Sequence, residues 1–224
     1  MNTCEVDSID GYYHAIADKP SLKRWAFRGH ANVEWRLVPT IGRVSYSTDR
    51  EAALFRLWKR RACEYLDNPS SLSEWDWLSV AQHHGLNTRL LDWTHNPMAA
   101  LFFAVERELD TDAAVYAYLP PEKAIHTDSE YGPFDLSAGI SAVIPRRIAA
   151  RITRQSGIFT CHNPPDLDLA AADLEPDRLF KIVVPKTARS NLKFALANLG
   201  VDRSTLFPDL DGLAAYMNWL QTGA

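Results

Sequence analysis

The alternation of apolar and polar residues predicts a helix over residues 48–66. Thr48 and Glu51 stand at its start in the T-x-x-E arrangement of a capping box, which satisfies free backbone amides. Apolar residues then recur every three or four positions, as in a helix with one buried face. These residues are Leu54, Phe55, Trp58, Ala62 and Tyr65 or Leu66.

A second helix is predicted from Ser71 to His84. Ser71 and Glu74 repeat the capping-box spacing, and Gly85 supplies the left-handed residue that commonly follows a helix. An earlier helix is expected after Ser8, an N-cap residue.

A third, more apolar helix is predicted to begin at Asn96 and Pro97, an N-cap followed by proline in the first helical position. It has almost no polar residue before Glu106, so we expect it to be buried nearly all round.

Short runs of β-branched and aromatic residues predict strands. The runs are "WAFRG", "LNTRLLDWT", "AAVYAYL", "GISAVIP", "IFTCH" and "RLFKIVVP". Further helices are expected over 146–157, 187–200 and 211–221, and the polar, proline-rich segment 162–177 is typical of a mobile loop. Strands and helices do not alternate strictly, which favours an α+β fold with a mixed or antiparallel sheet flanked by helices.

Composition adds bounds to this picture. The chain has 224 residues, 46% of them hydrophobic, without a repeat or linker, so we expect one compact domain over 1–224. A formal net charge of −4 argues against a protein held on nucleic acid by bulk charge, while a local basic patch stays compatible with it.

The cysteines and the apolar runs indicate a cytoplasmic protein. Cys4, Cys63 and Cys161 are odd in number and widely spaced, which fits reduced thiols better than a disulfide framework. The first residues lack the features of a signal peptide, and the longest apolar run, "MAALFFAV", is too short to cross a bilayer. We therefore expect no membrane partner, and the oligomeric state stays open.

The first candidate for chemistry is Arg28, in "WAFRGH". An arginine at the end of a strand can project into a cleft, where Gly29 admits close approach of a ligand or of another backbone segment. The alternative is an arginine that pairs with an internal carboxylate and holds the sheet edge.

The second candidate is the stretch 82–104, "QHHGLNTRLLDWTHNPMAALFFA". His84 is expected at a helix C-terminus, where the macrodipole favours imidazolium, and with Arg89 it could contact a ribose or a phosphate. Asp92 is positioned to pair with Arg89. The alternative is structural: His84 caps the helix, Arg89 and Asp92 form a buried ion pair, and Trp93 belongs to the core.

Two later segments offer weaker candidates. In "RITRQSGIFTCH", Arg154, Gln155 and Thr160 could read the polar edge of a ligand, or the segment is a helix end followed by an edge strand. In "LFPDLDG", Asp209 marks a turn and Asp211 is expected to cap the last helix.

Common catalytic and metal motifs are missing from the sequence. His83, His84, His95, Cys161 and His162 have no accepted zinc spacing, and we expect no metal site. The nucleophile elbow G-x-S-x-G, the dinucleotide fingerprint G-x-G-x-x-G and the Walker A pattern are also missing.

Taken together, these segments resemble the FRG domain family, named for its Phe-Arg-Gly. The resemblance is carried by "FRGH" with "WRL" and Pro39 behind it, by 82–104, by "RITRQSGIFTCH" and by "LFPDLDG". It extends from about Trp25 to the last helix, which gives a motif-bearing core of about 22–221.

The family in turn resembles ADP-ribosyltransferases, in which a strand-end arginine or histidine binds the ribose and phosphates of NAD. That similarity implies NAD as the substrate, without a metal. It assigns the dinucleotide pocket to Phe27, Arg28, Gly29, His30, His84, Arg89, Asp92, Trp93 and Thr160.

The chain departs from the transferase pattern at the catalytic carboxylate. Transferases use a late glutamate that holds the ribose and stabilises the oxocarbenium-like centre as nicotinamide leaves. Glu106, Glu130 and Glu175 are expected on a helix or in loops. Glu51 or Gln155 would therefore take that role, beside Arg28 and His84.

Three functions follow from the sequence. The first is a NAD-dependent ADP-ribosyltransferase or NAD glycohydrolase that acts as a toxin or anti-phage effector in a bacterial cytosol, on a protein or nucleic-acid acceptor. The second is a non-catalytic module that binds a nucleotide, a nucleic-acid end or a peptide in the same cleft. The third is a nuclease with Asp209 and Asp211 at a metal site.

Overall fold

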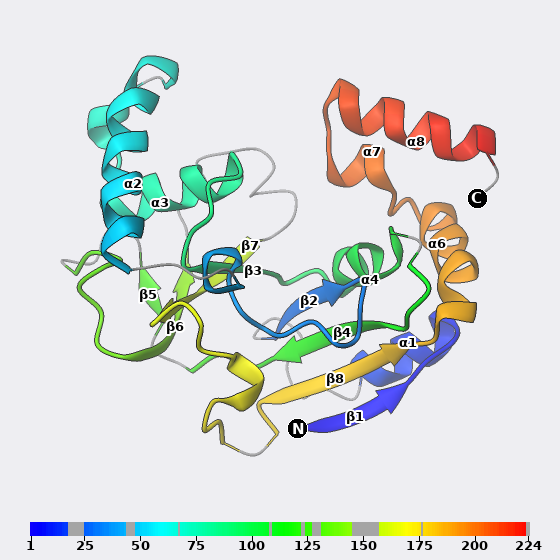
Figure 1. The fold of residues 1–224 in the computed structure, drawn as a ribbon. Helices are drawn as coiled ribbons and strands as arrows, with labels where there is room; N and C mark the ends of the chain where they lie inside the picture. The colour runs from blue at the N-terminus through cyan, green and yellow to red at the C-terminus, as the bar shows by residue number, and fades with distance from the viewer. Residues whose placement is uncertain are drawn as a thin grey trace.

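Eight strands form one mixed sheet in the computed structural model (Figure 1). The model describes residues 1–17, 25–43, 48–66, 68–107, 109–121, 124–126, 131–144, 157–175 and 177–222, with only the backbone of residues 48 and 49. Across the sheet the strands are β1 (Asn2–Glu5), β8 (Leu179–Val184), β4 (Ala113–Tyr118), β2 (Ala26–His30), β3 (Leu90–Thr94), β7 (Gly157–Asn163), β6 (Gly139–Ile144) and β5 (Ile125–His126).

The outermost pairs, β1 with β8 and β5 with β6, are parallel, and the pairs between them are antiparallel. The α+β class with a mixed sheet is therefore confirmed. The sequence analysis did not predict the two edge strands, β1 and β5. β1 is exposed along its length and β5 has two residues, so neither has an apolar pattern to detect.

The helices lie above the sheet in Figure 1, with α2 and α3 over one end, α6 to α8 towards the other, and α4 between them. They are α1 (Ile9–Ala17), α2 (Thr48–Ala62), α3 (Glu74–His83), α4 (Pro97–Val105), α6 (Arg189–Asn198), α7 (Arg203–Leu206) and α8 (Leu210–Thr222). Single 3₁₀ turns occur at Thr40–Arg43, Cys63–Tyr65, Pro69–Ser71, Leu169–Ala171 and Lys186–Ala188. No helix in the described ranges combines the length and the apolar character needed to cross a bilayer.

Helix α4 is the centre of the core, as its sequence predicts. The Asn96 side chain caps it by accepting from the amides of Met98 and Ala99, at 3.0 and 3.3 Å. The helix packs directly on β2, because a Cβ at Gly29 would lie 2.0 Å from the carbonyl oxygen of Ala100. The glycine of "FRG" is therefore explained by the approach of α4, the backbone alternative of the two that the sequence offered.

Three apolar clusters surround the sheet. One joins α1, α4, α6 and α7 to β2, β4 and β8, and another joins α2 and α3 to β3, β6 and β7. The third covers the opposite face of β2 and β4, where loops supply Leu37 and Leu169. The predicted mobile loop 162–177 is thus anchored, since Leu169 is fully buried and Asp168 binds Arg36 at 3.1 Å.

The predicted cap of α3 is wrong. The helix begins at Glu74 and its cap lies two residues later than expected, because Ser73 and Asp76 form the capping box that was assigned to Ser71 and Glu74. Helix α2 begins at Thr48, as predicted, and the carboxylate of Glu51 is bound to Arg89; the side chain of Thr48 lies outside the described part of the structure, so the capping box there stays a prediction.

The apolar face of α2 also differs from the prediction. Phe55 and Ala62 are buried, whereas Leu54 is 42% exposed and Tyr65 is 83% exposed. The core contacts the row that carries Glu51, and a second apolar row faces outward. The helix predicted over 146–157 lies almost entirely outside the described residues.

Candidate functional site

The sheet divides between β2 and β3. β2 pairs with β4 along its whole length and β3 pairs with β7 along its whole length, but in the described part of the chain β2 and β3 are paired at a single position, Phe27 with Thr94. Beyond that point Arg28 follows on β2 and Asp92 on β3, and the ladder between them is open. An arginine here lies where two strands part.

The guanidinium of Arg28 spans this opening. Its Nη1 donates to the backbone oxygen of Asp92 at 2.6 Å, and its Nε donates to Nε2 of His30 at 2.9 Å. The side chain is 18% exposed. Burial lowers the pKa of Arg28 to about 10, against the attraction of Asp92, so the group stays charged at neutral pH.

His30 is a neutral partner of that arginine. Its Nδ1 lies 3.2 Å from the carbonyl oxygen of Trp35, so this nitrogen donates and Nε2 accepts from Arg28. Burial, together with the charges of Arg28 and Arg43, lowers the pKa of His30 to about 2. The imidazole therefore orients Arg28 without neutralising it.

Asp92 lies on the rim of the opening. Its Oδ2 is 3.9 Å from Nη1 of Arg28 and accepts from Nε2 of Gln82 at 2.8 Å, and its side chain is 56% exposed. Gln82 is itself held by the hydroxyl of Thr88, at 2.7 Å. This carboxylate is thus held in place but open to solvent.

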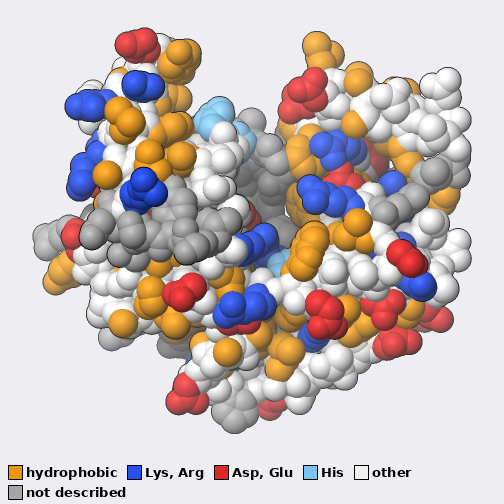
Figure 2. Space-filling model, in the orientation of Figure 1, with side chains coloured by type: hydrophobic (Ala, Val, Ile, Leu, Met, Phe, Trp, Pro, Cys, Tyr) orange, Lys and Arg blue, Asp and Glu red, His pale blue; other side chains and the backbone are white. Residues whose placement is uncertain are grey.

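A cleft of about 550 Å³ extends from the strand opening towards α7. Its walls carry four arginines, two carboxylates and several aromatic rings, and Figure 2 shows Lys and Arg side chains gathered in the hollow between the two helical lobes. The charged groups are Arg28, Arg43, Arg107, Arg203, Asp92 and Glu106, and the aromatic ones include Phe27, Trp35, Trp93, Phe103, Phe159 and Phe207. The cleft suits an anionic ligand with flat rings.

Arg43 and Arg203 are fixed in different ways. Nε of Arg43 donates to the carbonyl oxygen of Val38 at 2.8 Å, and burial lowers the pKa of this arginine. Arg203 pairs with Glu106 and lies over the ring of Phe207, 4.8 Å from its centroid. The Glu106 carboxylate is therefore already paired with Arg203 and is not free to contact a ligand.

A comparison with known protein families finds a match in the part of the chain that contains β2 and β3. The model of the FRG domain matches residues 23–113. This chain carries an FRG domain. No curated protein and no solved structure matches it significantly.

The FRG domain match contains the arginine of the strand opening, the helix that packs on it and the loop before β3. The assignments beyond residue 113, in "RITRQSGIFTCH" and "LFPDLDG", stay predictions. In the second of these, α8 begins at Leu210 and Asp209, not Asp211, accepts from the Gly212 amide at 2.7 Å. The expected Asp211 cap is wrong by two residues.

Arg89 of the FRG domain lies away from the cleft, in a sealed ion pair. Its Nη2 and Nε donate to Oε2 and Oε1 of Glu51 at 2.7 and 3.0 Å, and both side chains are 3% exposed. The expected pair of Arg89 with Asp92 does not form. Side chains three positions apart along an extended chain point to opposite faces. Glu51 likewise does not line the cleft.

His84 lies elsewhere again. It lines an apolar groove between α2 and α3, while its neighbour His83 faces the cleft. At the end of α3 these two residues project in different directions, because successive helical positions lie about 100° apart. The sequence analysis selected one of them, and the geometry places the other in the lining of the cleft.

Trp93 and Thr160 belong to a buried polar chain behind the cleft. Nε1 of Trp93 donates to the Thr160 hydroxyl at 3.1 Å, and that hydroxyl lies 2.9 Å from Nε2 of His162. Burial lowers the pKa of His162 to about 4, so this imidazole is neutral. Thr160 is 1% exposed and is engaged inside the protein. Gln155, with Arg154, lies outside the described residues.

Sequence reasoning missed Arg43, Arg107 and Arg203. Arg203 follows Asp202, which caps α7 in a D-x-x-T capping box, so the start of a helix was detectable there. Nothing in the local pattern shows that this short helix faces β2. Among the described residues no three or more His, Cys, Asp or Glu side chains cluster in a way that could hold a metal ion.

Proposed function

We propose that the cleft binds a dinucleotide, with NAD as the first candidate, and that Arg28 holds its phosphates. The observation that carries this proposal is the state of Arg28. Its Nε and Nη1 are bound to neutral acceptors, while Nη2 has no acceptor within the described part of the chain. The guanidinium of Arg28 is therefore charged, held in a fixed orientation and left with N–H donors to spare. These properties favour a phosphate as the ligand, because a phosphate can accept two parallel hydrogen bonds.

The rest of the cleft supports the same ligand class. Arg43 and Arg107 add positive charge to the lining of the cleft, in a setting where water is partly excluded and attraction is stronger than in bulk solvent. The rings of Trp35, Phe103 and Phe207 offer apolar surface for a base or for nicotinamide. A cleft of about 550 Å³ falls in the size range of small-molecule sites.

We further propose that Asp92 is the carboxylate of a transferase or glycohydrolase reaction. In that reaction the bond between nicotinamide and ribose breaks, and its electron pair leaves with nicotinamide. The acceptor or water then adds to the ribose carbon and loses a proton. Glu51 is sealed against Arg89 and Glu106 is bound to Arg203, whereas Asp92 is half exposed in the cleft. A carboxylate there would stabilise the positive charge that develops on the ribose.

The proposal is tested by NAD binding and by nicotinamide release. At a concentration about a hundred times Kd, NAD is expected to raise the Tm of the wild-type chain by about 5 °C. Arg28→Ala should abolish the shift, whereas Arg178→Ala, which removes a partly exposed arginine bound to Glu175, should keep it. Asp92→Asn should keep the shift and lose nicotinamide release. A wild-type chain that shows neither a shift nor release with NAD would contradict the proposal.

A second function, nucleotide binding without turnover, is favoured by one specific observation. The cleft holds no unpaired glutamate among its described lining residues, since Glu106 is bound to Arg203. The two functions separate in the same experiment. If NAD shifts the Tm in a way that depends on Arg28 and the wild-type chain releases no nicotinamide, the result favours binding without turnover over catalysis.

A further inference from the structure

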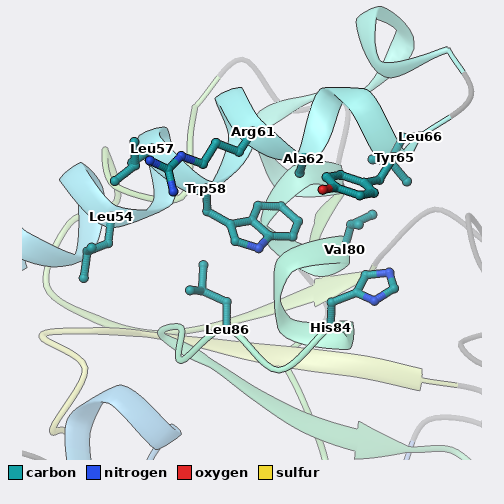
Figure 3. Close-up of a pocket in the computed structure, with 10 residues that line it drawn as sticks. All are labelled: Leu54, Leu57, Trp58, Arg61, Ala62, Tyr65, Leu66, Val80, His84 and Leu86. Carbon is teal, nitrogen blue, oxygen red and sulfur yellow. The ribbon is translucent and has the colours of Figure 1, made fainter.

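A groove of about 530 Å³ separates α2 from the end of α3 (Figure 3), and none of its lining residues lines the cleft. Trp58 lies at its centre above Leu86, with Leu54 and Leu57 on one side and Val80 on the other. The lining is almost entirely apolar. This groove has no part in the proposed nucleotide site.

The groove is bordered by a row of apolar side chains that the protein leaves in solvent. Leu54, Leu57 and Tyr65 are 42%, 37% and 83% exposed. Leu54, Leu57 and Trp58 share one face of α2, and Tyr65, in the 3₁₀ turn that follows the helix, continues the apolar lining of the groove. An exposed apolar row of this length next to a groove indicates a surface that another element covers.

The same surface is positively charged at its edge. Arg61 lines the groove, and Arg56 and Arg60 are exposed on the same helix. None of the three forms an ion pair with a residue that the structure describes. By contrast, Lys59 on this helix is bound to Glu74. The occupant of the groove is therefore expected to be apolar and acidic.

Helix α8 presents a face with those two properties. Leu210, Leu213, Met217 and Leu220 are 82%, 43%, 53% and 50% exposed. Their spacing of three, four and three residues places them on one side of the helix. The opposite side, with Gly212, packs against the preceding turn at Phe207.

The charge of α8 is opposite to that of the groove edge. The helix contains no lysine or arginine, and Asp211 lies exposed in its first turn, two positions after the capping Asp209. At 1.5 Å per residue, the row from Leu210 to Leu220 is about 15 Å long and the row from Leu54 to Tyr65 about 16 Å long. The two apolar rows match in length and the flanking charges are complementary.

We propose that α8 of one copy of this chain docks into the α2–α3 groove of a second copy. Within one molecule α2 and α8 stand on opposite sides of the central hollow, so the two surfaces meet only between copies (Figure 1). The contact joins different surfaces of the two molecules. Used reciprocally it closes a two-fold dimer, and used once per molecule it builds a larger ring or chain.

Sedimentation measurements with one variant on each surface test this assembly. Leu57→Asp changes the groove and Met217→Asp changes the α8 row, and both positions are exposed, so folding should be unaffected. The wild-type chain is expected to associate as its concentration rises, and each variant is expected to associate about tenfold more weakly or to stay monomeric. Leu199→Asp is the matched control, because Leu199 is 61% exposed and lies on neither surface.

An equal mixture of the two variants provides the sharper test. The Leu57→Asp chain keeps an intact α8 row and the Met217→Asp chain keeps an intact groove, so the mixture should form mixed pairs that neither variant forms alone. Higher salt should weaken them, because charge attraction is screened. A wild-type chain that stays monomeric at high concentration, or a mixture without mixed pairs, overturns the proposal and assigns the groove to another occupant.

Discussion

Arg28 and Arg89 show how the same residue type can hold a fold or remain available to a ligand. Arg89 places two guanidinium nitrogens on the oxygens of Glu51, and both side chains are 3% exposed. Arg28 binds a neutral imidazole and a backbone oxygen, and its nearest carboxylate oxygen is 3.9 Å away. The charge of Arg89 is neutralised inside the protein by Glu51. The charge of Arg28 is held in place by neutral acceptors and is not neutralised.

The comparison shows that the partner of a buried cation, more than its burial, determines whether the cation can bind an anionic ligand. A buried guanidinium with a bidentate carboxylate has no capacity left for an anion. A guanidinium held by neutral acceptors at the edge of a cleft keeps its charge for a ligand, because burial does not lower its pKa enough to deprotonate it. Three predictions test this difference between the two arginines.

The largest effect is expected from Glu51→Ala. The variant leaves the charge of Arg89 buried and unpaired, which should cost about 3–5 kcal/mol in the free energy of unfolding. Chemical denaturation measures the loss. Glu175→Ala, which breaks an exposed pair with Arg178, serves as the control and should change stability by less than about 1 kcal/mol. An equal loss in both variants would contradict the sealed pair.

A smaller effect is expected on acidification, through His30 and His162. Both are neutral in the fold, with pKa values lowered to about 2 and about 4, chiefly by burial, while an unfolded histidine titrates near 6.5. Between pH 6.5 and 4 the unfolded chain therefore binds more protons than the folded chain, and stability falls as the pH falls. At pH 5.5 each histidine has removed about 1 kcal/mol relative to pH 6.5, so the two together cost about 2 kcal/mol, less than the loss expected for Glu51→Ala.

Denaturation at pH 7.5, 6.5 and 5.5, with NMR of the imidazoles, measures this dependence. Stability should be nearly constant between pH 7.5 and 6.5 as far as these histidines are concerned, and lower at 5.5. An imidazole of His30 that titrates near pH 6 would show that the partner of Arg28 is not held neutral.

The smallest effect on stability is expected from Arg28→Ala. The variant leaves the Nε2 atom of His30 and the carbonyl oxygen of Asp92 without a donor, at the edge of a cleft that water can enter. We expect a loss of about 1 kcal/mol, well below that of Glu51→Ala. Denaturation of the two variants side by side measures the ratio, and a larger loss in Arg28→Ala would assign Arg28 to the fold and not to a ligand.

Much of the fold was predictable because its signals are local. Asn96 and Pro97 fix the start of α4, and Gly85 and Gly200 end α3 and α6 with φ values of +86° and +76°. The strands with β-branched and aromatic runs were found, and β1 was not, since its four exposed residues have no apolar alternation. Caps were predicted less well. Ser71 and Ser73 are both good capping residues with an acid three positions on, and only packing chooses between them.

The candidate site was predictable in part, since Arg28 with Phe27 and Gly29, and Asp92 with Trp93, were assigned to the pocket and line the cleft. Arg28 was found because a strand, an aromatic residue and a glycine surround it in sequence. Arg43, Arg107 and Arg203 were not found, because they come from three separate segments that meet only across the cleft. Glu51 and Arg89, 38 positions apart, were assigned to the pocket because the sequence does not show that they meet each other.

The sequence alone determined the helices, most strands, the α+β class and the position of the FRG arginine, since these depend on periodicity, caps and neighbouring residues. Tertiary structure decided which arginine faces a carboxylate and which faces a cleft. The environment of each arginine depends on where β2 and β3 separate and on which residues of distant segments come within a few ångströms of it. The local sequence pattern contains neither piece of information.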